Sequence, residues 1–234
     1  MDRTGRARQR ILAVFLPVTA VLYASAVALN PKGTDQLITG TATALKVLPI
    51  AADHSAQLYL SGSLSLLALG GLAVSYAAIA MLVARRGWVI ATVAALLGGV
   101  GAFSGALLNV LVGVNLAAAA SAHMTQHAAA LFLVTSFHSV PAQVATDVYF
   151  LGEYAAPVVM GIALWRSQNV PRWLAVLFVL GLEIAEALPS SGPIALLFAL
   201  PFVAAMILLA ARIWQAAVLP ARQYQELAAV PAAT

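Results

Sequence analysis

The chain has 234 residues, of which 62% are hydrophobic and only 9% are charged, and it contains no Cys. An ordinary soluble domain carries about 25% charged residues, so this composition excludes a typical soluble domain and favours an integral membrane protein, while the lack of Cys excludes disulfides and thiolate sites. The net charge of +4 comes from basic residues at the ends of apolar runs, which is a membrane pattern, so nucleic acid is not expected as a partner.

Six apolar runs along the chain approach or exceed the length of about 20 residues that a membrane helix needs. We therefore expect one all-α domain over residues 1–234, folded as a polytopic bundle of about six transmembrane helices. The expected spans are 11–29, 57–84, 88–112, 145–165, 173–188 and 193–214.

The arginines lie in alternate connections between these spans. Four arginines precede the first span, and later connections contain one pair each: Arg85 with Arg86, Arg166 with Arg172, and Arg212 with Arg222. The only basic residues expected on the opposite side are Lys32 and Lys46. The positive-inside rule then predicts a multi-pass protein of the cell membrane with both termini in the cytoplasm. Four tryptophans fall at the same expected boundary, as an aromatic belt does: Trp88, Trp165, Trp173 and Trp214.

The longest expected connection, residues 113–146, is not a plain polar loop. Its apolar part from Ala117 to Val134 predicts a short interfacial or re-entrant helix that caps the outer side of the bundle. In such a helix His123 and His127 share a face, and His138 follows in the same connection. A divalent metal is the one cofactor that this pattern suggests, on the condition that the histidines approach nearby acids. The alternative is that they are interfacial or capping residues.

Intramembrane acids are the strongest functional signal, because a charged group at bilayer depth costs about 2.5 to 3.5 kcal/mol. Glu153 lies inside the fourth expected span, and Glu183 and Glu186 share one face of the fifth. With Asp147 they form an acidic set on a side of the membrane that has no Arg. Buried acids without cations raise their pKa or recruit a cation, so these four residues are candidates for acid-base catalysis. The alternative is that they are protonated and only orient the helices.

Polar residues at helical spacing extend the acidic set. Pro157 cannot donate to the carbonyl of Glu153, so one helix turn offers both a carboxylate and a backbone acceptor. These rows of residues at helical spacing, or stripes, can also be explained by helix packing alone, because Gly101-x-x-x-Gly105 is a small-residue helix interface. The expected ligand-binding residues are Tyr149, Asn109, Gln57, Ser61 and His54.

The connection between the fourth and fifth spans carries a family resemblance. A helix ends in Trp165-Arg166-Ser167 and the next begins with Pro171-Arg172; the Ala-Leu-Leu-Asn sequence at 106–109 is a further similar feature. From about residue 42 to 214 the order of features resembles a family of uncharacterised bacterial six-helix integral membrane proteins, a domain of unknown function. The resemblance implies a bacterial protein with a six-helix membrane fold, and it implies no activity. Glu153 does not match that family's pattern, nor does Glu183, so any chemistry there belongs to this chain.

Three functions fit this pattern. The first is a membrane-embedded enzyme, of the isomerase or cyclase kind, that takes a lipid or terpenoid-like molecule from the surrounding lipids into an outer pocket and transforms it by acid-base chemistry. The second is a small proton- or cation-coupled transporter or sensor. The third is an accessory or assembly subunit without a site. The inner half of the expected spans is nearly free of polar residues, which favours a pocket over a path through the membrane.

Overall fold

The computed structural model describes residues 3–34, 38–83, 87–121, 124–187 and 191–218. These residues fold into helices and contain no strand, which confirms the all-α prediction. The helices are α1 (Arg3–Leu29), α2 (Thr41–Asp53), α3 (Ser55–Ala80) with the short 3₁₀ helix η1 (Met81–Val83), α4 (Trp88–Ser121), α5 (Gln126–Phe137), α6 (Val140–Ser167), α7 (Arg172–Ala187) and α8 (Ala195–Val218).

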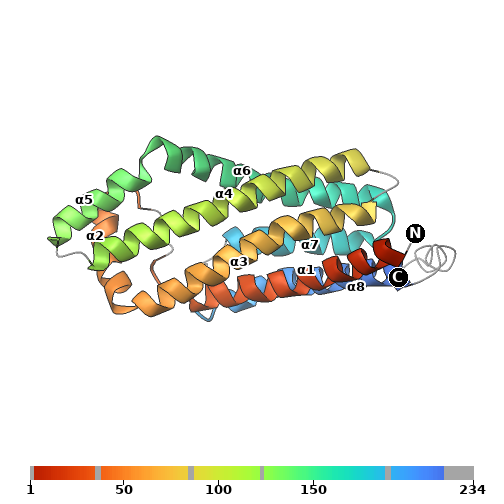
Figure 1. The fold of residues 1–234 in the computed structure, drawn as a ribbon, viewed down its shortest axis with the longest axis horizontal. Helices are drawn as coiled ribbons and strands as arrows, with labels where there is room; N and C mark the ends of the chain where they lie inside the picture. Colours follow the sequence, from red (N-terminus) through yellow and green to blue (C-terminus); the bar gives the residue numbers. More distant parts are fainter. Residues whose placement is uncertain (1–2, 35–37, 84–86, 122–123, 188–190, 219–234) are drawn as a thin grey trace.

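The long helices form an up-and-down bundle. Helices α1, α3, α4, α6, α7 and α8 each pack on the next in this order, and α8 also packs on α1. Figure 1 shows the start of α1, the start of α4, the end of α6 and the end of α8 at one end of the bundle, and α2 and α5 at the other. We call the first the Arg–Trp end, after Arg10, Arg172, Trp165 and Trp214, and the second the capped end.

Five of these helices are long and apolar enough to cross a membrane. They contain the segments Ala7–Leu29, Ser55–Val83, Trp88–Val110, Val140–Ser167 and Ala195–Val218. Helix α7 has 16 residues and falls short of that length. Large apolar side chains cover the outer faces of the bundle, including Phe103 at 72% exposure, as expected of surfaces that contact lipid. The described helices therefore indicate a multi-pass membrane protein.

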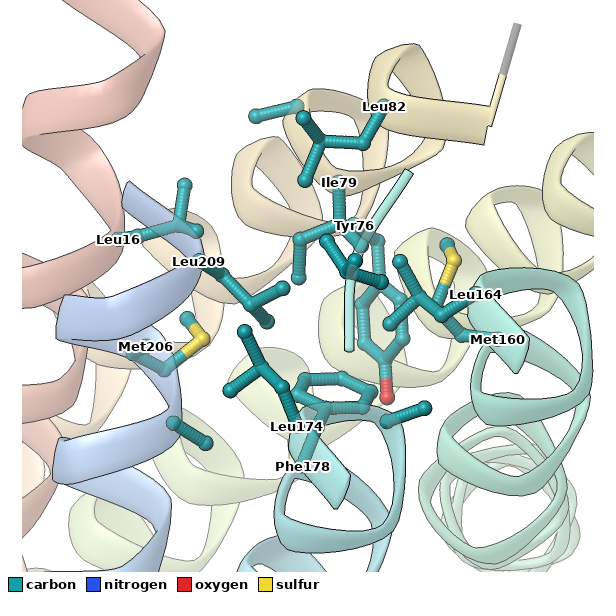
Figure 2. Packing of buried hydrophobic residues seen from close by; sticks show 14 of the residues in the cluster. Leu16, Tyr76, Ile79, Leu82, Met160, Leu164, Leu174, Phe178, Met206 and Leu209 are labelled. Carbon is teal, nitrogen blue, oxygen red and sulfur yellow. The ribbon is translucent and has the colours of Figure 1, made fainter. Parts of the chain in front are cut away.

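The main core fills the half of the bundle near the Arg–Trp end. Figure 2 shows Leu16, Tyr76, Met160, Phe178 and Leu209 converging from α1, α3, α6, α7 and α8. The rings of Tyr76 and Phe178 meet edge to face, with centroids 6.2 Å apart. The largest side chains of this core are almost completely buried, and apart from Tyr76 they are apolar, so this half of the bundle is closely packed.

A second, smaller core lies at the capped end, where the structure differs from the sequence prediction. Helix α4 continues to Ser121, nine residues beyond the expected end at 112. With 34 residues it is about 51 Å long, which exceeds the hydrocarbon core of about 30 Å. Its last turns pack with α2 and α5 through Leu48, Leu116 and Leu133. This packing makes a helical cap of α2, α5 and the end of α4.

The expected single helix over residues 117–134 is therefore corrected to the end of α4 and a separate α5. Met124 and Thr125 are not helical, and the Thr125 hydroxyl accepts a hydrogen bond from the N–H of Ala128. This is an N-cap, which satisfies one of the free N–H groups at the start of α5. A local capping residue thus interrupts an apolar run that would otherwise continue as a helix.

Candidate functional site

A cavity of about 480 Å³ lies at the capped end of the bundle. Helices α1, α3, α4 and α6 form its sides, and residues of α2 and α5 also contribute. Its volume lies within the range of about 300 to 1,000 Å³ that small-molecule pockets occupy. Tyr59, Leu66 and Val110 belong both to the cavity wall and to the exposed surface, so the cavity opens beside α3 and α4.

The position of α6 beside this cavity depends on glycines of α4. A Cβ built on Gly101 would lie 2.7 Å from the Cα of Gly152, so the two backbones are in direct contact. One turn further along α4, a Cβ on Gly105 would lie 2.5 Å from the ring of Tyr149. Gly105 therefore leaves the space that the Tyr149 ring occupies on the cavity wall.

Tyr149 connects the cavity to an acid. Its hydroxyl donates a hydrogen bond to Oε1 of Glu153, one turn further along α6. Tyr149, Glu153, Ala156 and Met160 follow the spacing of one helix face, and the last two are fully buried. Glu153 therefore points toward the interior of the bundle and not toward lipid.

The polar part of the wall comes from several helices. The Ser61 hydroxyl on α3 donates to the carbonyl of Ala26 on α1 at 2.8 Å, and it is buried. On α4, the Asn109 amide donates to the carbonyl of Gly105 at 3.0 Å. The Thr146 hydroxyl on α6 donates to the carbonyl of Ala142 at 2.7 Å. The remaining wall is largely apolar, so the cavity combines a hydrocarbon surface with a few fixed polar groups.

Three of the five expected ligand-binding residues line the cavity: Ser61, Asn109 and Tyr149. The other two, Gln57 and His54, are exposed near the start of α3 and are not part of the described wall. A ring nitrogen of His54 lies 3.2 Å from the carbonyl oxygen of Ile50, at the end of α2.

The expected acids lie at different places around the bundle. Asp147 is exposed on α6, and Glu153 lies next to the cavity through Tyr149. Glu183 is half-buried on α7, one turn from Val179, which contacts α6. The described cavity wall contains no residue of α7. The side chain of Glu186 lies outside the described residues, so a site that the fourth and fifth span acids share stays a prediction.

The expected histidine cluster does not form on one helix. His123 lies outside the described residues, and His127 is exposed in the first turn of α5. His138 caps the other end of α5, where its Nδ1 lies 2.8 Å from the carbonyl oxygen of Val134. The separation of eleven positions between His127 and His138 corresponds to about 16 Å along the helix. Within the described part of the chain, no group of three or more His, Asp or Glu residues is arranged to hold a metal ion.

Part of the cavity wall was not expected from the sequence. The connection after α1 supplies Asn30, Thr34 and Ile38, and α2 supplies Val47 and Ala51. The signal for α2 was present in the spacing of its buried positions, Ala44, Val47, Leu48 and Ala51, which is that of an amphipathic helix. A short amphipathic helix is easily missed between longer apolar runs.

Comparisons with protein-family models, with curated proteins and with solved structures found no match. The resemblance to a bacterial six-helix family therefore stays a prediction, and the function is argued from the site alone.

Proposed function

We propose that this membrane protein takes an amphipathic or apolar small molecule, lipid-like or terpenoid-like, into the cavity at its capped end and acts on it by acid-base chemistry. The observation that carries the proposal is the hydrogen bond from Tyr149, on the cavity wall, to Glu153 behind it. A hydrophobic cavity with an ionisable group one hydrogen bond away is the arrangement that proton transfer to or from an apolar ligand requires.

The direction of the hydrogen bond suggests how protons would move. The Tyr149 hydrogen points to the Glu153 carboxyl group, so the hydroxyl oxygen is the atom that can accept a proton from the ligand. In that step the ligand loses a proton to Tyr149 as Tyr149 passes its own proton to the carboxylate of Glu153. The reverse transfer returns a proton to the ligand, so the pair supports isomerisation as well as binding.

The main core favours this function over a transporter. A through-pathway needs polar groups along both halves of the bundle. Instead, the half near the Arg–Trp end is filled mainly by apolar side chains such as Leu16, Phe178 and Leu209, and its buried Ser75 hydroxyl donates to the hydroxyl of Thr19 at 3.4 Å. A ligand would therefore enter and leave at the capped end.

For the membrane topology, we propose six spans, with α7 as the sixth, α5 as an interfacial cap, and the Arg–Trp end in the cytoplasm. Two cation–π pairs support this orientation, because they join the basic and aromatic residues typical of the cytoplasmic boundary. Arg10 lies 5.7 Å from the ring centre of Trp214, and Arg172 lies 5.2 Å from that of Trp165. The α7 helix measures about 24 Å, so it would cross a locally thinned bilayer.

Filling the cavity tests the proposed function. Gly62 is on the wall, and a Cβ there meets no atom within 4 Å, so Gly62→Phe places a ring in the cavity without a backbone clash. Gly70→Phe is the matched control, because Gly70 is on the same helix, is exposed, and also has open space at its Cβ. The proteins are purified in mild detergent, and the small molecules bound to them are extracted and identified by mass spectrometry.

The wild type and Gly70→Phe should carry the same bound molecule, and Gly62→Phe should lose most of it. The same extracted molecules in the same amounts from all three proteins would contradict the proposal, because occupancy would then not depend on the cavity.

A further inference from the structure

Five of the nine hydroxyl groups on the described cavity wall share one property, which is that their hydrogens are already donated to the protein. Each hydroxyl has one hydrogen and two lone pairs, so a hydroxyl that donates to the protein offers a ligand only its lone pairs. The five wall hydroxyls in this state are Thr34, which donates to Pro31 or Asn30, and the hydroxyls that donate from Ser61 to Ala26, Ser63 to Tyr59, Thr146 to Ala142, and Tyr149 to Glu153.

This pattern makes much of the polar wall a hydrogen-bond acceptor. At these five hydroxyls, a ligand group that only accepts, such as an ether or a carboxylate, would face lone pairs with its own lone pairs. A ligand group that donates would instead complete the hydrogen bonds of the wall. Asn109 retains a second amide hydrogen after its bond to Gly105, so a group that both donates and accepts fits best.

The lack of charged side chains on the described wall disfavours ligands with a charged head group. Among the described residues that line the cavity there is no Lys, Arg or His, so nothing there compensates an anionic head group. The wall also contains no described Asp or Glu, and the carboxyl group of Glu153 is reached through Tyr149. An ammonium head group would therefore find, among the described wall residues, no direct carboxylate partner of the kind that a buried cation requires.

We propose that the cavity selects an amphipathic alcohol, which is a hydrocarbon with an uncharged hydroxyl head group, over the corresponding ether, carboxylate, phosphate or amine. This inference rests on the proposed function, and it names the class of molecule on which the Tyr149 and Glu153 pair would act. The ligand hydroxyl donates to a wall oxygen such as that of Thr146, and its tail lies along the apolar part of the wall.

Ligands that share one tail and differ only in the head group test this inference. The probe is a tritiated tetradecanol that carries a diazirine in its tail, crosslinked by light to the protein in phosphatidylcholine nanodiscs. Unlabelled tetradecanol, its methyl ether, tetradecanoic acid, tetradecyl phosphate and tetradecylamine compete with it. We expect the alcohol to compete about tenfold better than the methyl ether, since the ether loses one hydrogen bond and gains an unfavourable contact.

Thr146→Val should reduce the preference for the alcohol over the ether, because valine keeps the shape and removes the acceptor oxygen. Thr92→Val is the matched control, since the Thr92 hydroxyl makes the same bond to the carbonyl four residues before it, at 2.8 Å, on an exposed face of α4. That variant should keep the full preference.

The two proposals fail in different ways. If Gly62→Phe is labelled as strongly as the wild type and Gly70→Phe, the cavity does not bind the probe and the proposed function is wrong. If labelling depends on Gly62 but the ether or a charged head group competes as well as the alcohol, the cavity binds amphipathic molecules and the head-group inference is overturned.

Discussion

Gly101 on α4 and Gly152 on α6 are in backbone contact, and a Cβ on either residue would lie 2.7 or 2.5 Å from the Cα of the other. This contact brings α4 and α6 together at the base of the cavity and fixes the position of Tyr149 relative to Gly105. The sequence allowed two interpretations of the small residues on α4, as a helix-packing face or as part of a ligand site. Both apply here, because the packing of α4 on α6 shapes the cavity wall.

Gly101→Ala should force the two helices apart, because its new Cβ meets backbone and not a movable side chain. We expect a loss of about 1 to 3 kcal/mol in the free energy of unfolding, measured by reversible denaturation in mixed micelles. Gly99→Ala is the control on the same helix, where a Cβ meets no atom within 4 Å. It should be neutral or stabilise by roughly 0.5 to 1 kcal/mol. Equal stabilities of the two variants would show that the helices are not in close contact.

Substitutions of Glu153 should separate its chemical role from its structural role. Glu153→Gln keeps an oxygen that accepts the Tyr149 hydrogen but cannot take up a proton, so it should fold normally and change the ratio of bound substrate to product. Glu153→Leu removes the hydrogen bond and should lose roughly 0.5 to 2 kcal/mol of stability. Thermal melting and mass spectrometry of the bound molecules provide the two measurements. Unchanged bound molecules in Glu153→Gln would make the pair purely structural.

The cap should unfold separately from the bundle when its core is weakened. Leu133 is fully buried in the small core, whereas Leu131 on the same helix is 47% exposed. Leu133→Ala should cost about 2 to 5 kcal/mol of local stability through a cavity in that core. Hydrogen exchange should then rise in α2 and α5 and stay unchanged in α8. The control Leu131→Ala should change exchange little, and exchange that rises equally across all helices would argue against an independent cap.

Reporter fusions test the orientation that the arginines predict. Reporters at the two chain ends should be active in the cytoplasm, and one inserted at Thr125, between α4 and α5, should be active outside. Thr125 is a suitable position because it lies in a non-helical turn at the capped end. A terminal reporter outside, or the insertion on the same side as the termini, would contradict the proposed topology.

The helices of the bundle were largely predictable, because long apolar runs directly report burial in lipid. The cap was predicted only in part: the sequence indicated a capping helix, but it did not show that the short helix α2 packs against the end of α4. Leu116 illustrates this: it is 3% exposed only because α2 and α5 cover it. A run of apolar residues in the sequence does not show which distant helices will pack on it.

The site was predictable in part for the same reason. Helical spacing placed Tyr149 and Glu153 on one face of α6, and the structure joins them by a hydrogen bond. Ser61 and Gln57 lie on the same face of α3, but their spacing alone does not show at which residue this face becomes exposed. The expected histidine face depended on a continuous helix, which the cap at Thr125 interrupts.

Whether the cavity binds an amphipathic molecule is tested most directly by an experimental structure of the protein in nanodiscs made from its native membrane lipids. The cavity should hold elongated density, with its polar end near Thr146 and Tyr149 and its tail along Leu69 and Leu108. A cavity closed by side chains, or one in which ordered water alone contacts Tyr149, would contradict this prediction.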